Sequence, residues 1–162
     1  MSIKLSRSEP AIDARDVEAL EIQISTQLPE SFRQFFLTQN GGVSNRDWWD
    51  GDGENEAIRL KRFKAIARSG AQDASDTKYL GGCYTAMTKR QVIPATLLPF
   101  AIDDGGNFFC LDLADGCVCF YATDSFDSDL TVTENQVNAY RWLAGTFDDF
   151  VSGLKNESDV DL

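Results

Sequence analysis

Histidine is absent from this sequence, and its absence excludes several familiar kinds of active site. Histidine is the commonest general base at neutral pH and the commonest metal ligand, and it activates the nucleophile of Ser-His and Cys-His enzymes. A bilayer-spanning run of about 20 apolar residues is also lacking. The opening residues, "MSIKLSRSEPAIDARD", have no apolar core of a secretory signal. We therefore expect a cytoplasmic protein with no catalytic residues and no metal or other cofactor.

Cysteine is scarce, and the four cysteines do not form a metal-binding pattern. They are Cys83, Cys110, Cys117 and Cys119. Three of them lie in apolar, strand-like segments, so we expect reduced thiols packed in the core. Cys117 and Cys119 are one residue apart and have no second CxxC-like pair, which argues against a structural zinc site.

Basic residues are nearly absent from the C-terminal part of the chain. Residues 1–90 hold 13 acidic and 13 basic residues, whereas residues 91–162 hold 13 acidic residues and only Arg141 and Lys155 as cations. The formal net charge of −11 therefore arises entirely after residue 90. Such a field repels nucleic acid and anionic lipid and attracts basic partners, so we expect neither nucleic acid nor a membrane as the ligand. The alternative is that these acids only keep the protein soluble.

The chain is long enough for one ordinary domain. Apolar residues spaced three or four apart predict helices at residues 13–25, at Pro29 to Asn40-Gly41-Gly42, and at 134–154, the last with Thr133 and Gln136 as a capping box. Strands are predicted at 57–63, where the alternation slips after Leu60 as at a bulge or a strand end, and at 97–102. The order of helices, strands and a final helix favours an α+β fold. We expect a single domain over residues 1–155, with a central, mostly antiparallel sheet flanked by helices, and an acidic tail at 156–162.

A hairpin is predicted from residues 107–113 and 117–121. Asp115-Gly116 is typical of a two-residue type I′ turn. That turn would place Leu113 opposite Val118 and Leu111 opposite Phe120 on one face. The other face would carry Cys110, Asp112, Cys117, Cys119 and Tyr121. Apolar residues on both faces predict a sheet that helices cover on part of each side.

Two acidic clusters and a tryptophan pair are candidate sites. Residues 50–56 look like a calcium loop, but an EF-hand needs glycine at position six and glutamate at twelve, where this chain has Asn55 and Lys61. A solvated turn is favoured there over a weak cation site. Asp124, Asp127 and Asp129 form the second cluster, which no nucleophile motif or phosphate loop accompanies. Of Trp48 and Trp49, alternation along a strand predicts that one packs in the core and the other is a candidate binding anchor.

Three blocks of the sequence carry a family resemblance. The first contains Leu20-Glu21, Leu28-Pro29, the aromatic segment 32–37 and Asn40-Gly41-Gly42. The second is "LLPFAIDDGGNFFCLDL" and the third is "YRWLAGTFDDFVSGL". Together, in this order, they resemble the SUKH superfamily of Smi/Knr-type domains over most of the chain. Residues 42–94 depart most from the pattern.

The resemblance implies an α+β fold with a helix-flanked sheet, and a function in protein binding. Bacterial members are largely immunity proteins that neutralise a toxin delivered between competing cells, often a nuclease, and fungal relatives regulate cell-wall synthesis and signalling. A rigid acidic surface would fit the cationic groove of a basic nuclease and speed association with it. We therefore predict a non-enzymatic immunity protein, monomeric or weakly dimeric, whose partner is a cognate toxin of a contact-dependent or polymorphic toxin system.

The predicted contact residues are Asp103, Asp104, Asp115, Asp124, Asp127, Asp129 and Trp48 or Trp49. Asp112 is less favoured because its strand would bury it. Two alternatives stay open: a regulatory scaffold of the same fold with another protein partner, and, less favoured, a metal-dependent hydrolase that uses clustered aspartates.

Overall fold

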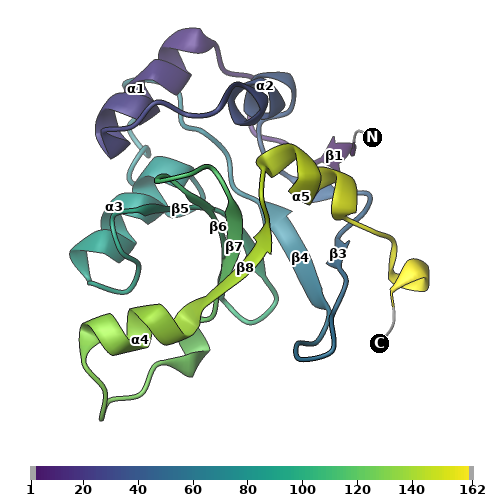
Figure 1. The fold of residues 1–162 in the computed structure, drawn as a ribbon. Helices are drawn as coiled ribbons and strands as arrows, with labels where there is room; N and C mark the ends of the chain where they lie inside the picture. Colours follow the sequence, from purple (N-terminus) through teal and green to yellow (C-terminus); the bar gives the residue numbers. More distant parts are fainter. Residues whose placement is uncertain (1–2, 161–162) are drawn as a thin grey trace.

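The structure, a computed structural model, describes residues 3–160, which form five α-helices, eight β-strands and two short 3-10 helices (Figure 1). In chain order they are β1 (Leu5–Ser6), α1 (Ala14–Ile24), α2 (Glu30–Thr38), β2 (Val43–Ser44), β3 (Trp48–Trp49), β4 (Ile58–Phe63), α3 (Leu80–Lys89), β5 (Leu97–Asp103), β6 (Phe108–Asp112), β7 (Val118–Tyr121), η1 (Thr123–Ser125), α4 (Val132–Ala139), β8 (Tyr140–Ala144), α5 (Phe147–Gly153) and η2 (Glu157–Asp159). Residues 1 and 2 of the predicted domain, and 161 and 162 of the predicted tail, lie outside the described residues. The domain bounds stay a prediction.

The strands form two antiparallel sheets. One pairs β1 with β2, and the other has the order β3-β4-β5-β6-β7-β8, so that each strand lies beside the next one in the chain. Helices α2 and α5 pack on one face of the large sheet, and α3 and α4 pack on the other (Figure 1). The predicted α+β fold with a central antiparallel sheet flanked by helices is confirmed. Of the two alternatives for the slip after Leu60, the register shift between Leu60 and Arg62 within β4 favours the bulge.

The larger core lies between the sheet and helices α1, α2 and α5. Its centre is a group of phenylalanines in tilted and edge-to-face contact, with Phe32 and Phe147 ring centroids 4.8 Å apart and Phe100 and Phe147 centroids 5.3 Å apart. Such pairs contribute beyond the area they bury. The stripe predicted on α2 is therefore the face that is buried, and Phe32 and Phe36 are fully covered.

The smaller core lies on the opposite face of the sheet. Cys110, Cys119 and Tyr121 project from β6 and β7 and pack near Met87 of α3 and Ala139 of α4. All four cysteines of the chain are buried and none is in a disulfide, as predicted. The sheet is apolar on both sides because helices cover both sides.

The β6–β7 hairpin has the predicted faces but a different register. Leu111 pairs with Val118 and Cys110 with Cys119, which is two residues away from the pairing that a two-residue turn would give. The turn spans residues 113–116, because the Asp112 amide donates to the Cys117 carbonyl at 2.8 Å and the Gly116 amide donates to the Asp112 carbonyl at 2.8 Å. A slip of two residues preserves the alternation of side chains, so the predicted faces are unchanged.

The predicted helix over residues 134–154 is wrong. The chain forms α4, then β8, then α5, and β8 pairs with β7 through Tyr121 and Tyr140. An apolar run with helical spacing became a strand because the sheet edge offers backbone partners that local propensity does not reveal. The capping box of α4 is also displaced, since Thr131 and Glu134 form it in place of Thr133 and Gln136.

Helix α3 is absent from the sequence-based prediction. Its first turn contains Gly81 and Gly82, which are poor helix formers. A Cβ atom at Gly82 would lie 2.2 Å from the Asp76 carbonyl oxygen, so the glycine allows the preceding loop to pack directly on the helix. Among residues 3–160, no helix has both the length and the apolar character needed to span a membrane.

Candidate functional site

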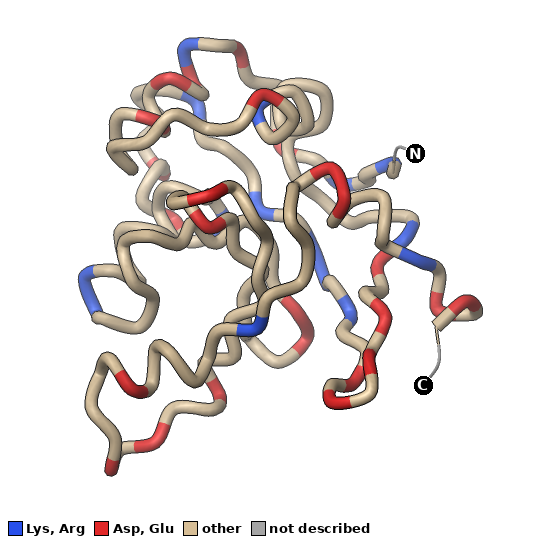
Figure 2. Tube along the Cα trace, viewed as in Figure 1, with Lys and Arg blue, Asp and Glu red and all other residues tan. Residues whose placement is uncertain are grey.

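Most of the predicted acidic contact residues lie at one end of the large sheet. Because neighbouring strands are antiparallel, this end receives the β3–β4 loop, the β5–β6 turn, the segment after β7 and the start of β8. Figure 2 shows the acidic residues of these loops in the lower part of the view. We call this region the acidic end and define it by Asp50, Asp52, Glu54, Glu56, Asp103, Asp104, Asp124, Asp127 and Asp129.

Asn107 joins the β5–β6 turn to η1. Its backbone amide donates to Asp103 Oδ1 at 2.7 Å, and its side-chain amide donates to Asp103 Oδ2 at 3.0 Å. The side-chain oxygen of Asn107 accepts from the Asp124 amide at 3.3 Å and from the Thr123 hydroxyl at 3.2 Å. Asn107 is only 4% exposed, so these bonds are shielded from water and hold the two acidic segments in a fixed relation.

Three cations tie the acidic end together from other elements. Arg59 of β4 pairs with Asp47 at 3.0 Å and with Asp104 at 3.5 Å. Arg141 of β8 lies 3.8 Å from Asp52. Lys155 pairs with Asp50 at 2.9 Å.

The remaining charge at the acidic end is uncompensated. Within residues 3–160, five exposed acidic side chains of this region have no ion pair, namely Glu54, Glu56, Asp124, Asp127 and Asp129. The Glu54 amide and the Asn55 side chain donate to the Asp52 carboxylate and lower its pKa, so it too is ionised at neutral pH. The arrangement can bind a cationic surface.

The sequence did not assign the β3–β4 loop to this surface. Its acids are balanced along the chain by the bases of residues 1–90, so the charge count places the excess only after residue 90. In space the loop joins the C-terminal acids, because the Arg141 guanidinium donates to the Glu56 carbonyl at 3.2 Å. A contact between residues 56 and 141 leaves no signal in a single sequence.

The two predicted tryptophans occupy β3, beside the acidic loop. Trp49 packs on the core: its ring stacks on Phe150 with centroids 5.1 Å apart, and a Cβ at Gly153 would lie 2.6 Å from it. Trp48 pairs with Arg59 on β4, and its backbone exchanges hydrogen bonds with Lys155. Both rings are half-buried, and Trp49 is the one with a packing role.

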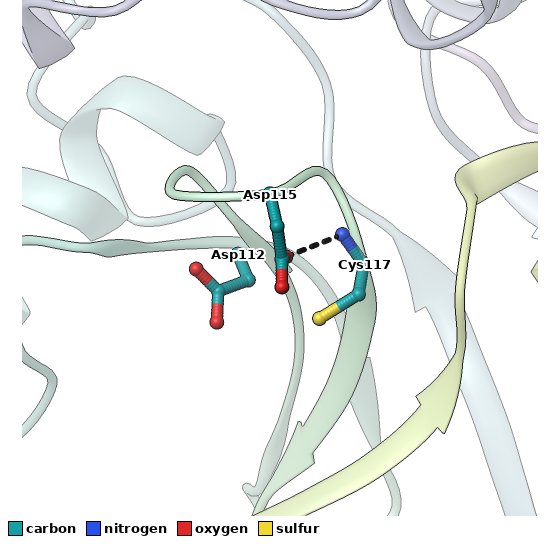
Figure 3. A group of neighbouring side chains, drawn as sticks. All are labelled: Asp112, Asp115 and Cys117. Atoms are coloured by element: carbon teal, nitrogen blue, oxygen red, sulfur yellow. Dashed lines mark hydrogen bonds between the residues drawn. The ribbon is translucent and has the colours of Figure 1, made fainter.

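Asp115 lies at the opposite end of the sheet from the other predicted acids. It belongs to the β6–β7 turn, where its carboxylate accepts from the Cys117 amide at 3.0 Å, a bond that lowers its pKa. Figure 3 shows it with Asp112 and Cys117, whose ligand-type atoms all lie within 4.8 Å of one another. Burial raises the pKa of Cys117 to about 11, so the thiol is protonated at neutral pH and is a poor metal ligand in that state. The hydrogen bonds of the β6–β7 turn explain why Asp112, Asp115 and Cys117 lie close together, so their proximity does not require a metal ion.

The comparison with protein-family models identifies the fold family. The model of the SMI1/KNR4 family (SUKH-1) matches residues 11–153, which include the acidic end and the β6–β7 turn. The chain belongs to the SMI1/KNR4 (SUKH-1) family. Proteins of this SUKH-1 family typically bind a partner protein, and the chain is consistent with their immunity type.

One curated relative of this SUKH-1 chain is the SPbeta prophage-derived uncharacterized protein YokK of Bacillus subtilis (strain 168). The two are 25% identical over 170 residues, which cover 91% of this chain and 78% of the relative. The match extends over most of both proteins and carries no assigned activity.

Proposed function

We propose that this SUKH-1 protein is a non-catalytic immunity protein that binds and neutralises a cognate toxin, a basic nuclease, through the acidic end of its sheet. The observation that carries the proposal is the set of five exposed acids without ion pairs, within residues 3–160, on a surface that Asn107 and Arg141 hold together. Membership of a partner-binding family supports a function in protein–protein binding. The proposed contacts are Asp104, Asp124, Asp127, Asp129 and Trp48.

The physical basis is electrostatic steering by a surface that does not rearrange. A nuclease presents positive charge to the phosphate backbone of its substrate. A fixed acidic surface accelerates encounter with such a groove and disfavours partners of other charge. Since Asp103 accepts three hydrogen bonds within its own turn, its role is to shape the surface, and the freer carboxylates such as Asp129 supply the contact.

The test begins with co-purification of the tagged protein from its host and calorimetry with the recovered partner. We expect a one-to-one complex with a basic toxin domain, which weakens when NaCl is raised from about 50 mM to about 300 mM because screening shortens the Debye length. A tight complex whose affinity does not change with the NaCl concentration would show that the contact lies outside the acidic end. Partners without a toxin among them would favour the regulatory scaffold.

Charge reversal locates the contact. The double variant Asp124→Lys with Asp129→Lys should weaken toxin binding by about a hundredfold, since each removes a favourable charge and adds a repulsive one. Asp127 is kept because its carboxylate accepts from the Asp129 amide at 2.8 Å. The matched control is Glu18→Lys with Glu157→Lys, which changes the net charge equally at exposed positions on α1 and η2. Equal affinity of the two double variants would exclude the acidic end as the contact.

A further inference from the structure

A hollow of about 350 Å³ lies between α4 and the large sheet. Its walls come from the segment before β5, from β5 and β6, from α4 and from the first residue of β8. We call it the β8 hollow and define it by Pro94, Thr96, Leu97, Asp112, Thr133, Gln136, Val137 and Tyr140. Apart from Asp112, these residues are uncharged, and most of the exposed lining is apolar.

Asp112 brings a carboxylate without a counter-cation into this hollow. One oxygen accepts from the Ala114 amide at 3.0 Å and the other from the Tyr140 hydroxyl at 3.0 Å. Burial raises the pKa of Tyr140, so the phenol stays neutral and is the donor in this bond. Neither Asp112 nor the neighbouring Asp115 has an ion pair within residues 3–160. A carboxylate has about four acceptor positions, so Asp112 keeps about two for a ligand.

The basic residue closest in sequence to Tyr140, Arg141, does not pair with Asp112. No lysine or arginine occurs between Arg90 and Arg141. Arg141 neighbours Tyr140 on β8, but its guanidinium donates to the Glu56 carbonyl in the β3–β4 loop. A half-buried charge in an apolar setting is costly when unpaired, so a cation from outside the chain is the natural complement.

Exposed apolar side chains concentrate around the same hollow. Within residues 3–160, four large apolar side chains are exposed, and three of them belong to α4 and β8: Val132, Val137 and Trp142. Val137 lines the hollow and is 68% exposed. Trp142, 59% exposed, follows Tyr140 by two residues on the outer strand of the sheet, so both project from the same face. Tryptophan is among the residues enriched at the energetic centres of protein interfaces.

We propose that the β8 hollow receives a lysine or arginine side chain of the partner protein. The aliphatic stem packs on Val137 and Leu97, and the cationic head bonds to Asp112. The ring of Tyr140, which lines the hollow, offers a π face to the same cation. The inference rests on the proposed function in taking the partner to be a basic protein, and it assigns that partner a second point of attachment, distinct from the acidic end.

The first experiment uses capped peptides and needs no identified partner. The ¹⁵N-labelled protein is titrated with acetyl-Gly-Lys-Gly-amide, with its arginine analogue, and with a norleucine analogue that has the stem but no charge. We expect the cationic peptides to shift the amides of Val137 and Tyr140, with at least about tenfold tighter binding than norleucine. Asp112→Asn should abolish that preference. Equal shifts with all three peptides, or none at these residues, would overturn the proposal.

A second variant guards against a structural effect of Asp112→Asn. Val137→Lys places an ammonium at the hollow from within the chain and leaves Asp112 in place, so it should block the cationic peptides. The matched control is Ile22→Lys, which adds the same charge at an apolar side chain of α1 that is 79% exposed. If both lysine variants bind the peptides like the wild type, the hollow is not the site.

The partner recovered by co-purification separates this inference from the proposed function. Asp112→Asn and Val137→Lys should each weaken its binding by at least about tenfold, whereas Ile22→Lys should not. If both variants bind a toxin as tightly as the wild type does, the β8 hollow is not a contact, and the proposed immunity function stands. If peptide binding depends on Asp112 but no toxin is found among the partners, the β8 hollow is a binding site and the proposed immunity function is contradicted.

Discussion

The Arg141 guanidinium donates to the Glu56 carbonyl at 3.2 Å and lies 3.8 Å from the Asp52 carboxylate, although 85 positions separate residues 56 and 141 in the chain. This contact links β8, at one edge of the six-stranded sheet, to the loop that follows β3 at the other edge. The sheet must therefore curl, and the curl brings acids from distant parts of the chain onto one surface.

Loss of the Arg141 contact should loosen that surface without unfolding the protein. We expect Arg141→Gln to lower the free energy of unfolding by about 1 kcal/mol, because one hydrogen bond from a charged donor and one weak ion pair are removed. Amide hydrogen exchange at residues 50–57 should accelerate at the same time. Arg90→Gln, at an exposed position, is the control and should change neither quantity. Unaltered exchange in the loop would show that Arg141 does not hold it.

The fold was predictable where local pattern and tertiary environment agree. The apolar stripe of α2 is buried, as its spacing predicts. On β6, Cys110, Leu111 and Asp112 alternate between the two faces of the sheet, as the period of a strand predicts. Local pattern failed at residues 140–144, where an apolar run compatible with a helix forms the outer strand because β7 offers it a backbone ladder. The predicted register of the β6–β7 hairpin was wrong because the carboxylates of Asp112 and Asp115 accept hydrogen bonds that stabilise a longer turn than Asp-Gly usually makes.

The candidate site was predictable only in part, for a similar reason. Charge counting located Asp103, Asp124 and Asp129, which are close in sequence. It could not add the β3–β4 loop or separate Asp115 from the others, because both depend on which strand ends meet. The exposure of Trp142 on the outer strand was not predicted, because its segment was interpreted as a helix and not as a strand of the sheet.

The corrected start of α4 predicts which threonine caps it. Thr131 accepts from the Glu134 amide at 3.1 Å, and the Glu134 carboxylate accepts from the Thr131 amide at 3.1 Å. Thr131→Ala should therefore cost about 1 kcal/mol in the free energy of unfolding. Thr133→Ala, two residues further on, should cost less than about 0.5 kcal/mol, as for other exposed positions. Urea unfolding of the two variants decides between the caps, and a larger loss for Thr133 would restore the sequence-based boundary.

The glycines that end the α2 segment predict a second pair of variants. Gly42 has φ of 119°, and a Cβ there would lie 2.2 Å from the Ser6 carbonyl oxygen. Gly42→Ala should thus lower stability by about 2 kcal/mol or more, through backbone strain and displacement of the strand β1. A Cβ added at Gly53 would meet no atom within 4 Å, so Gly53→Ala should be nearly neutral. Thermal melts suffice, and a tolerated alanine at position 42 would contradict the close approach of the two segments.

The buried thiol of Cys117 predicts a loss of stability at alkaline pH. Burial raises its pKa in the folded protein from 9.0 to about 11, so the folded state retains a proton that the unfolded chain releases first. Ionisation of Cys117 therefore does not affect stability below about pH 8, where its thiol is protonated in both states, and it lowers stability as the pH rises through 9 to about 11. A shift of this size corresponds to roughly 2–3 kcal/mol. Cys117→Ser keeps a hydroxyl near Tyr140 but does not ionise in this range, so its unfolding free energy should fall less steeply over the same interval. Urea unfolding at a series of pH values measures both slopes. Parallel slopes would mean that Cys117 is not held protonated by its surroundings, and that the β6–β7 turn is open to water at its thiol.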